Sequence, residues 1–175
     1  MNAPTTPLED VAREARGFRD SFRTLHLATA GADGTPSASY APFALSSDDR
    51  FQVYVSELAA HTANLLRGTP VSVLIIESEH DAAHLFARKR LTFTCAPQHC
   101  PRGSDAFEAV LAGLEERFGE FMGYLRTLTD FHAFTLEARH ATYVRGFAQA
   151  YEFPDGRLET IRHVNDRGHA ADDEN

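Results

Sequence analysis

The sequence has no excess of basic residues and no long apolar run. Its 17 lysines and arginines are outnumbered by 25 aspartates and glutamates, and the formal net charge is -8. General nucleic-acid binders usually carry a strong basic excess, so the balance argues against that class. The longest apolar run, residues 71–76, suits a strand and is far too short to span a membrane. We therefore expect neither nucleic acid nor membrane among the partners.

Cysteine is also scarce, and several familiar motifs are missing. Cys95 and Cys100 are the two cysteines, too few for a disulfide framework or a zinc site, so each is read as a small buried side chain or a free thiol. Residues 1–10 lack the apolar segment of a secretory signal peptide. There is no glycine-rich phosphate loop and no serine-nucleophile elbow. These features together predict a cytoplasmic protein.

The pattern of apolar residues predicts one mainly β domain with flanking helices, an α+β class. The length of 175 residues, with 43% hydrophobic and 24% charged residues, suits a single domain with a real core. Helical spacing predicts helices at 8–22, 58–66 and 104–118, the last two capped by Ser56 and Ser104. Strands are predicted at 25–30, 36–44, 51–55, 71–76, 89–96, 131–136, 141–144 and 147–153, with 71–76 buried on both faces. About eight short strands at this spacing favour a closed or nearly closed antiparallel barrel. We place this domain at residues 1–165 and a flexible, glycine-punctuated tail at 166–175.

Three neighbouring basic residues, Arg88, Lys89 and Arg90, form the first candidate site. On a strand Arg88 and Arg90 would share one face, and two guanidinium groups there suit a phosphate or a carboxylate. A solvated basic edge paired with surface acids explains the same residues equally well.

His61 is the second candidate. Glu57 and Asn64 lie four residues before it and three residues after it, so the three side chains can share a helix face. A surface histidine on a polar face is the alternative. The pair His80 and His84 has a spacing that can hold zinc on a helix, but it lacks the glutamate of metalloproteases, and we expect no metal there.

Several strings, in order along the chain, resemble the pyridoxamine-phosphate-oxidase-like split barrels, and within them the haem-utilisation subfamily of bacterial haem-degrading proteins. The resemblance covers residues 18–169. The strings are LHLAT (25–29), SYAPF (39–43), SELAAHTANL (56–65), LFARKRLTF (85–93), RFGE (117–120) and VRGFAQA (144–150).

This resemblance implies a fold and a set of site residues. It implies an FMN-binding-type split barrel that pairs as a homodimer with sites at the interface. The pair Gly168 and His169 matches the position that supplies the axial ligand of haem iron, with His163 as the second choice. Asp130 matches the residue that accepts a hydrogen bond from this ligand across the dimer; taken alone, it could equally be a turn or cap aspartate. Arg90 and His61 match positions in or near the cofactor pocket.

The implied function is binding of haem and its oxidative degradation to a biliverdin-like product with iron release, using electrons from a donor protein. The alternatives are a haem storage dimer, a sensor or structural dimer with an empty site, and an FMN-dependent oxidoreductase. For FMN phosphate, Ser39 and Thr62 could join the three basic residues at 88–90. Segment 56–64, however, lacks the lysine or arginine that true pyridoxamine-phosphate oxidases carry there.

Overall fold

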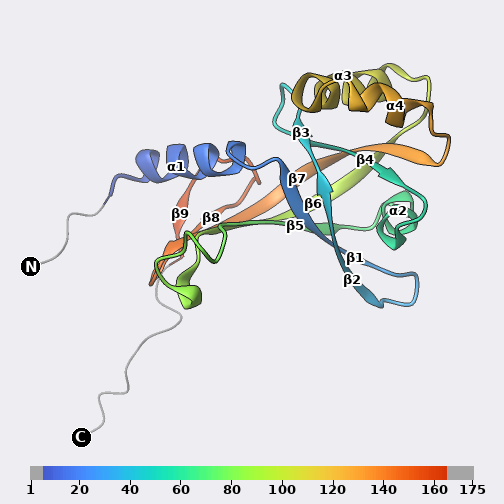
Figure 1. Cartoon of the computed structure of the whole chain (residues 1–175). Coiled ribbons are helices and arrows are strands. Elements are labelled where there is room, and N and C mark those ends of the chain that lie inside the picture. Colours follow the sequence, from blue (N-terminus) through green and yellow to red (C-terminus); the bar gives the residue numbers. More distant parts are fainter. Residues whose placement is uncertain (1–5, 165–175) are drawn as a thin grey trace, which may run out of the picture.

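The computed structural model describes residues 6–164, which form one curled antiparallel sheet with helices around it (Figure 1). The helices are α1 (Leu8–Asp20), α2 (Ala60–Leu66), α3 (Asp105–Phe118) and α4 (Phe121–Thr127), with a short 3-10 helix η1 (Leu85–Ala87). The strands are β1 (Thr24–Ala30), β2 (Pro36–Pro42), β3 (Ala44–Leu45), β4 (Phe51–Ser56), β5 (Val71–Ile76), β6 (Arg90–Cys100), β7 (Phe131–Gly146), β8 (Gln149–Phe153) and β9 (Arg162–His163).

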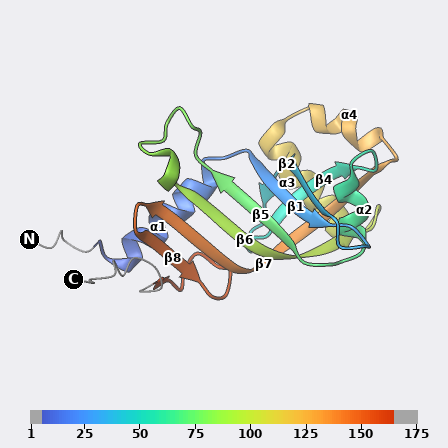
Figure 2. The ribbon, with the colours of Figure 1, turned by 90° about the horizontal axis from the view of Figure 1, so that it is seen from below.

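The two long strands β6 and β7 organise the sheet. The strand order is β2-β1-β5-β6-β7-β4-β3, and β8 and β9 extend the sheet from β7. The first part of β7 pairs with β4, from Phe131 to Leu136, and its last part pairs with β8, from Ala141 to Gly146. The two ends of β7 therefore carry different neighbours: α2 and α4 lie toward one end of the molecule, and α1, β8 and β9 lie toward the other (Figures 1 and 2).

Two apolar clusters hold this arrangement together. Alternate residues of β1, β5 and β6 point into the main cluster, where they meet the apolar stripe of α1. A smaller cluster packs α3 and α4 against the other face of β4 and β7. Strand β4 is buried on both faces because Val53 and Val55 enter the first cluster while Tyr54 enters the second.

Several local predictions are wrong. Residues 131–146 form one continuous strand, because a bulge opposite Thr94 and Cys95 takes up Arg139 and keeps Ala138 and His140 paired with β6. Strand β5 alternates between buried and half-buried residues, so it is not buried on both faces. Helix α4 was not predicted, because it is short and buries one side chain, Met122, while its aromatic residues Phe121 and Tyr124 are exposed and form no apolar stripe.

Of the two predicted helix caps, one is confirmed. Ser104 accepts a hydrogen bond from the Phe107 backbone N–H at 3.2 Å and caps α3. Ser56 does not cap α2, which begins four residues later at Ala60. The Ser56 hydroxyl instead accepts from Leu58 N–H at 3.1 Å in the intervening turn. This turn matters for the candidate site.

Candidate functional site

Asp130 lies directly before β7 and is tied to the turn that follows β4. Its Oδ2 accepts a hydrogen bond from Ser56 Oγ at 2.6 Å, and its carbonyl accepts from Glu57 N–H at 2.9 Å. The half-buried carboxylate is thereby oriented by two elements. Among residues 6–164, no donor contacts its second oxygen, Oδ1. The residue is thus a turn aspartate that still has one oxygen available to accept a hydrogen bond.

His61 is buried, so the alternative of a surface histidine is wrong. The ring is 7% exposed, and its Nδ1 lies 2.7 Å from Ser39 Oγ. Because Ser39 Oγ donates to the Leu27 carbonyl at 3.2 Å, Nδ1–H is the donor to Ser39 and Nε2 keeps its lone pair. Burial lowers the pKa of His61, which favours the neutral ring.

The predicted grouping of His61 with Glu57 and Asn64 is also wrong. Glu57 precedes the helix, and its carboxylate contacts His132. Asn64 is buried and donates to Thr29 Oγ1 at 2.8 Å, which fastens α2 to the end of β1. The reason is that α2 starts later than the sequence pattern suggested, so Glu57 never joins its face.

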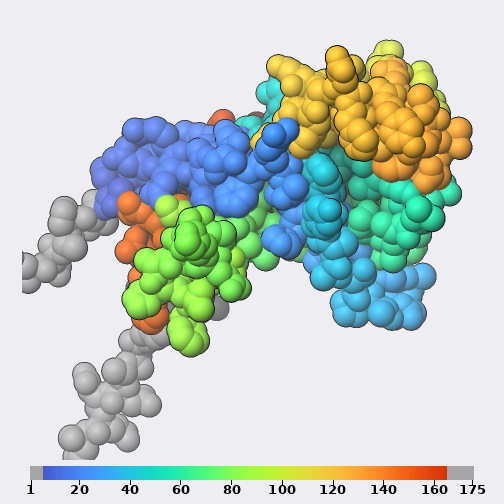
Figure 3. All heavy atoms as spheres, in the orientation of Figure 1, coloured from blue at the N-terminus to red at the C-terminus, as the bar shows by residue number. Residues whose placement is uncertain are grey.

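The three basic residues at 88–90 serve different purposes. Arg88 lies before β6 begins, so it does not share a strand face with Arg90 as predicted. Its guanidinium donates to the Glu77 carbonyl and lies 3.5 Å from the Glu79 carboxylate. These contacts belong to the segment between β5 and β6 (bright green in Figure 3), which projects beside α1.

Lys89 and Arg90 differ in whether their positive charge is balanced by a carboxylate within the described fold. Lys89 Nζ pairs with Glu14 at 2.8 Å, so its charge is balanced within the fold. Arg90 donates to the Arg88 carbonyl at 2.9 Å and has no carboxylate within salt-bridge distance in the described part of the chain. Of the three, Arg90 is therefore the one whose charge is left for an outside anion.

The predicted iron ligand lies beyond the described residues, as do Gly168 and the whole segment 166–175. His163, the second choice, is exposed on β9, and its ring meets Tyr151 edge-on at 4.8 Å between centroids. His163 pairs with Tyr151, which pairs with Tyr143 near the far end of β7. The described chain therefore ends near the end of β7 opposite to the one that Asp130 precedes.

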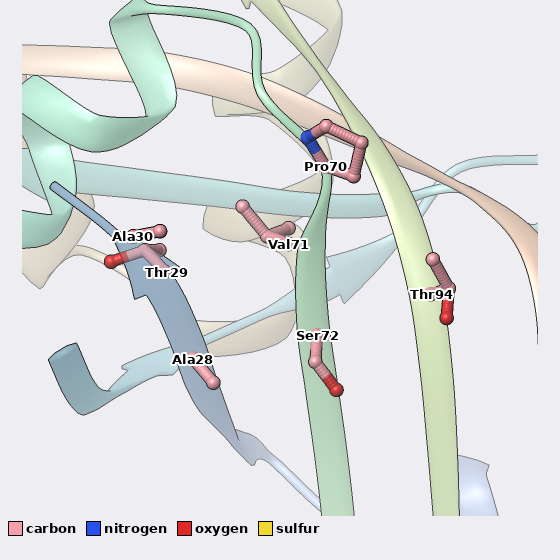
Figure 4. A pocket seen from close by; sticks show the side chains of 7 residues that line it. All are labelled: Ala28, Thr29, Ala30, Pro70, Val71, Ser72 and Thr94. Carbon is pink, nitrogen blue, oxygen red and sulfur yellow. The ribbon is translucent and has the colours of Figure 1, made fainter. Parts of the chain in front are cut away.

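A shallow hollow of about 320 Å³ lies beside α2 and was not predicted (Figure 4). Small side chains of β1, β5 and β6 surround it, among them Ala28, Ser72 and Thr94. None of Asp130, His61 or Arg90 lines it. The signal that could have indicated it is the small size of Ala28, Ser72 and Thr94, which lie at paired positions of the three strands.

A second unpredicted feature joins Glu57, His132 and His99. His132 Nε2 lies 2.7 Å from Glu57 Oε1, and its Nδ1 lies 3.3 Å from His99 Nε2. Burial and the nearby His132 lower the pKa of His99. From the sequence, His132 was expected to be an ordinary strand side chain, because the pairing of β6 with β7 that brings the two rings together is a long-range contact.

The two cysteines and the His80–His84 pair are the remaining candidates for thiol and metal chemistry. Cys95 and Cys100 are free and buried, as predicted, and burial raises the pKa of Cys95 to about 12. Residues 79–81 form a turn and 82–84 are irregular, so His80 and His84 do not share a helix face. Within residues 6–164, no three His, Cys, Asp or Glu side chains gather in a way that could hold a metal ion. In the same range no helix has the length and apolar character needed to cross a membrane.

Comparison with known proteins identifies relatives over most of the chain. The family profile for pyridoxamine 5'-phosphate oxidase matches residues 11–145. The chain is 40% identical over 156 residues to a protein of Vibrio cholerae serotype O1 named heme oxygenase HutZ, which covers 89% of this chain and 88% of the relative.

Solved structures agree with this result. The crystal structure of HutZ, described as the heme storage protein from Vibrio cholerae, superposes with a TM-score of 0.67 at 42% identity, over 71% of this chain and 87% of that chain. Campylobacter jejuni ChuZ superposes with a TM-score of 0.80 at 30% identity, over 91% of this chain and 64% of that chain. The predicted split-barrel fold is therefore confirmed.

Proposed function

The chain belongs to the pyridoxamine 5'-phosphate oxidase family, and from that premise we propose that it binds haem at a site shared by two subunits and degrades it oxidatively. The products are a biliverdin-like tetrapyrrole and iron. The observation that carries this proposal is the 40% identity, across 89% of the chain, to a protein named heme oxygenase. The family alone would leave FMN and haem equally open, and this relative favours haem.

The available oxygen of Asp130 fits a role beside an iron ligand. A histidine bound to a metal usually donates its other ring N–H to a carboxylate, which fixes its tautomer and raises its basicity. Asp130 Oδ2 is already held by Ser56, and Oδ1 is the acceptor that remains. We assign His169 as the residue that would bind the haem iron and Asp130 as the acceptor that would orient it.

Chain length requires that these two residues come from different subunits. A strand rises about 3.3 Å per residue, so the twelve residue steps from Phe131 to Tyr143 span roughly 40 Å along the strand. The described chain ends just after β9, two strands away from Tyr143, and the five residue steps from Val164 to His169 reach at most about 18 Å. His169 therefore cannot reach Asp130 of its own chain, and the proposed site is complete only in a homodimer.

The remaining site residues have separable tasks. Arg90 keeps an unbalanced guanidinium that suits a haem propionate, since guanidinium and carboxylate pair through parallel hydrogen bonds. His61 stays neutral and is held by Ser39, and its Nε2 is assigned as a hydrogen-bond acceptor near the haem. The haem iron, dioxygen and electrons from a donor protein supply the redox chemistry; the chain binds and orients the macrocycle.

FMN is the second candidate ligand, and the family itself favours it. Most of the residues expected to bind the FMN phosphate already have other partners within the fold. Lys89 is paired with Glu14, and the fully buried Thr62 donates to the Ser56 carbonyl at 2.6 Å. Ser39 is occupied by His61 and Leu27. These contacts leave Arg90 as the main anion ligand, which is weak support for FMN.

We expect haem titration of the untagged chain to give a sharp Soret band at one haem per subunit. His169→Ala should shift or abolish this band, because the proposed iron ligand is lost, while far-ultraviolet circular dichroism stays unchanged. Asp130→Asn should keep the band but bind haem roughly 10-fold to 100-fold more weakly, the usual effect of losing such a partner.

His163→Ala is the matched control, a tail-proximal histidine that should leave the spectrum unchanged. Sedimentation of the haem-loaded protein should give a dimer. A His169→Ala spectrum identical to that of the wild type would overturn the ligand assignment, and a yellow, flavin-loaded protein on purification would favour FMN.

Two free thiols, Cys95 and Cys100, suit the reducing cytoplasm, which we propose as the compartment.

A further inference from the structure

A pair of histidine rings faces each other where β6 and β7 run side by side, and the proposed haem site does not use it. His99 lies opposite Phe134 in the pairing of the two strands, and His132 lies two residues before Phe134 on the same face. The ring centroids of the two histidines are 5.4 Å apart. Both rings also contact Phe134, with centroid distances of 5.2 Å from His99 and 6.5 Å from His132. The pair is therefore positioned by two paired strands and one buried aromatic ring.

The hydrogen bonds of His132 determine which of its nitrogens is free. A carboxylate only accepts hydrogen bonds, so Glu57 Oε1, at 2.7 Å, takes the Nε2–H of His132. The neutral ring then has its lone pair on Nδ1, which points toward His99 Nε2 at 3.3 Å. Of the two facing imidazole nitrogens, therefore, at least one carries a lone pair.

The spacing of these nitrogens matches that of two ligands on one metal ion. Bonds of about 2.0–2.1 Å from zinc to imidazole nitrogen at tetrahedral angles put two such nitrogens about 3.3–3.4 Å apart. The Glu57 carboxylate also fits a metal site, since metal-bound histidines commonly donate their other N–H to a carboxylate. As a hydrogen bond between neutral rings, by contrast, 3.3 Å is long.

We propose that His99 Nε2 and His132 Nδ1 bind a divalent transition-metal ion of the zinc and copper class, with Glu57 orienting His132. Imidazole nitrogen is a preferred ligand of these ions. Binding replaces the single proton shared between the two rings by the metal, and His99 then carries its proton on Nδ1. Because His99 is exposed and His132 is half-buried, water completes the coordination, and the site is an open one with two protein ligands.

The test is calorimetric titration of Zn²⁺ into the untagged, haem-free full chain. The wild type should bind one Zn²⁺ per subunit. His99→Gln and His132→Gln should each weaken this binding by at least about tenfold, because a single imidazole remains. Glu57→Gln should have a smaller effect, since an amide oxygen still accepts the His132 N–H. Equal thermal unfolding temperatures without zinc would show that the variants are folded.

Two controls separate this site from the other histidines. His140→Gln changes a histidine on the same strand β7 whose Nε2 faces Glu152 at 3.7 Å, and His169→Ala removes the proposed haem ligand. Both should bind Zn²⁺ as the wild type does. Electron paramagnetic resonance with Cu²⁺ should show two coupled nitrogens in the wild type and one in His99→Gln. Absence of Zn²⁺ binding, unchanged binding in His99→Gln and His132→Gln, or loss of binding in either control would overturn the proposal.

Discussion

At the scale of single residues, the site depends on polar side chains whose environment differs from what the sequence suggests. His61 has the pattern of a surface histidine, yet it is 7% exposed and bonded to Ser39. Asp130 looks like a simple turn residue, yet Ser56 fixes one of its oxygens and leaves the other available. The sequence can identify such residues through family resemblance. It cannot provide their burial, because burial depends on which strands and helices cover them.

The burial of His61 predicts a pH dependence of stability. Its pKa is lowered in the folded protein by burial, so the unfolded chain binds a proton more readily. The contribution is fully present above the unfolded value of about 6.5 and is lost as the pH falls below it toward the folded pKa. His61→Gln should therefore make the free energy of unfolding fall less between pH 6.5 and 5 than it does in the wild type.

Urea unfolding at several pH values measures this effect, with an unchanged m-value as the check that both proteins expose the same surface on unfolding. His99 contributes in the same direction, so some of the slope should persist in the variant. If His61→Gln lost stability as steeply as the wild type between pH 6.5 and 5, the lowered pKa of His61 would be contradicted.

At the scale of elements, the long-range connections carry information that sequence patterns lack. The periodicity located α1, α3 and most strands, because each has a regular apolar face. It divided β7 in two, because Glu137, Arg139 and His140 interrupt the apolar pattern and the pairing of this segment with β6 through a bulge is invisible locally. The same long-range pairing brings His99 to His132, so the metal site proposed here could not be seen from spacing either.

Helix α1 is attached to the sheet by a polar contact that can be tested. Glu14 accepts hydrogen bonds from the Tyr143 hydroxyl at 2.9 Å and from Lys89 Nζ at 2.8 Å, and it pairs with Arg145 at 2.7 Å. Burial opposes ionisation of Glu14, but the bonds from Lys89 and Tyr143 outweigh it, and the net result is a lowered pKa. One carboxylate therefore joins α1, the start of β6 and the far half of β7.

Glu14→Ala should destabilise the protein by about 1–3 kcal/mol, because the hydroxyl of the buried Tyr143 loses its acceptor. Tyr143→Phe combined with Glu14→Ala should cost less than the sum of the two single changes, since the groups share one interaction. Glu9→Ala, an exposed change in the first turn of α1, is the control and should stay within about 0.5 kcal/mol of the wild type. Urea unfolding at pH 7 measures all four variants, and strictly additive costs would show that the contact does not couple the helix to the sheet.

At the scale of the whole molecule, the fold separates the two halves of the proposed haem site. Asp130 directly precedes one end of β7, and β9, the last described strand, lies toward the other end (Figure 1). Residue patterns predicted a mainly β barrel but could not choose its topology, which came from the family resemblance and is confirmed by the solved relatives. The distance between the two halves is a property of the assembled sheet alone. Because of this distance, the proposed haem site requires a homodimer on geometric grounds, independently of the family resemblance.

The most direct test of the account is turnover of haem bound to the purified dimer. Reductant, oxygen and catalase are added, and the Soret band, the tetrapyrrole product and the released iron are followed together. The account predicts that the Soret band disappears, that a biliverdin-like product forms, and that about one iron is released per haem, with His169→Ala losing this activity. A Soret band that stays stable in the wild type, with no product and no free iron, would contradict it and leave a protein that only stores haem.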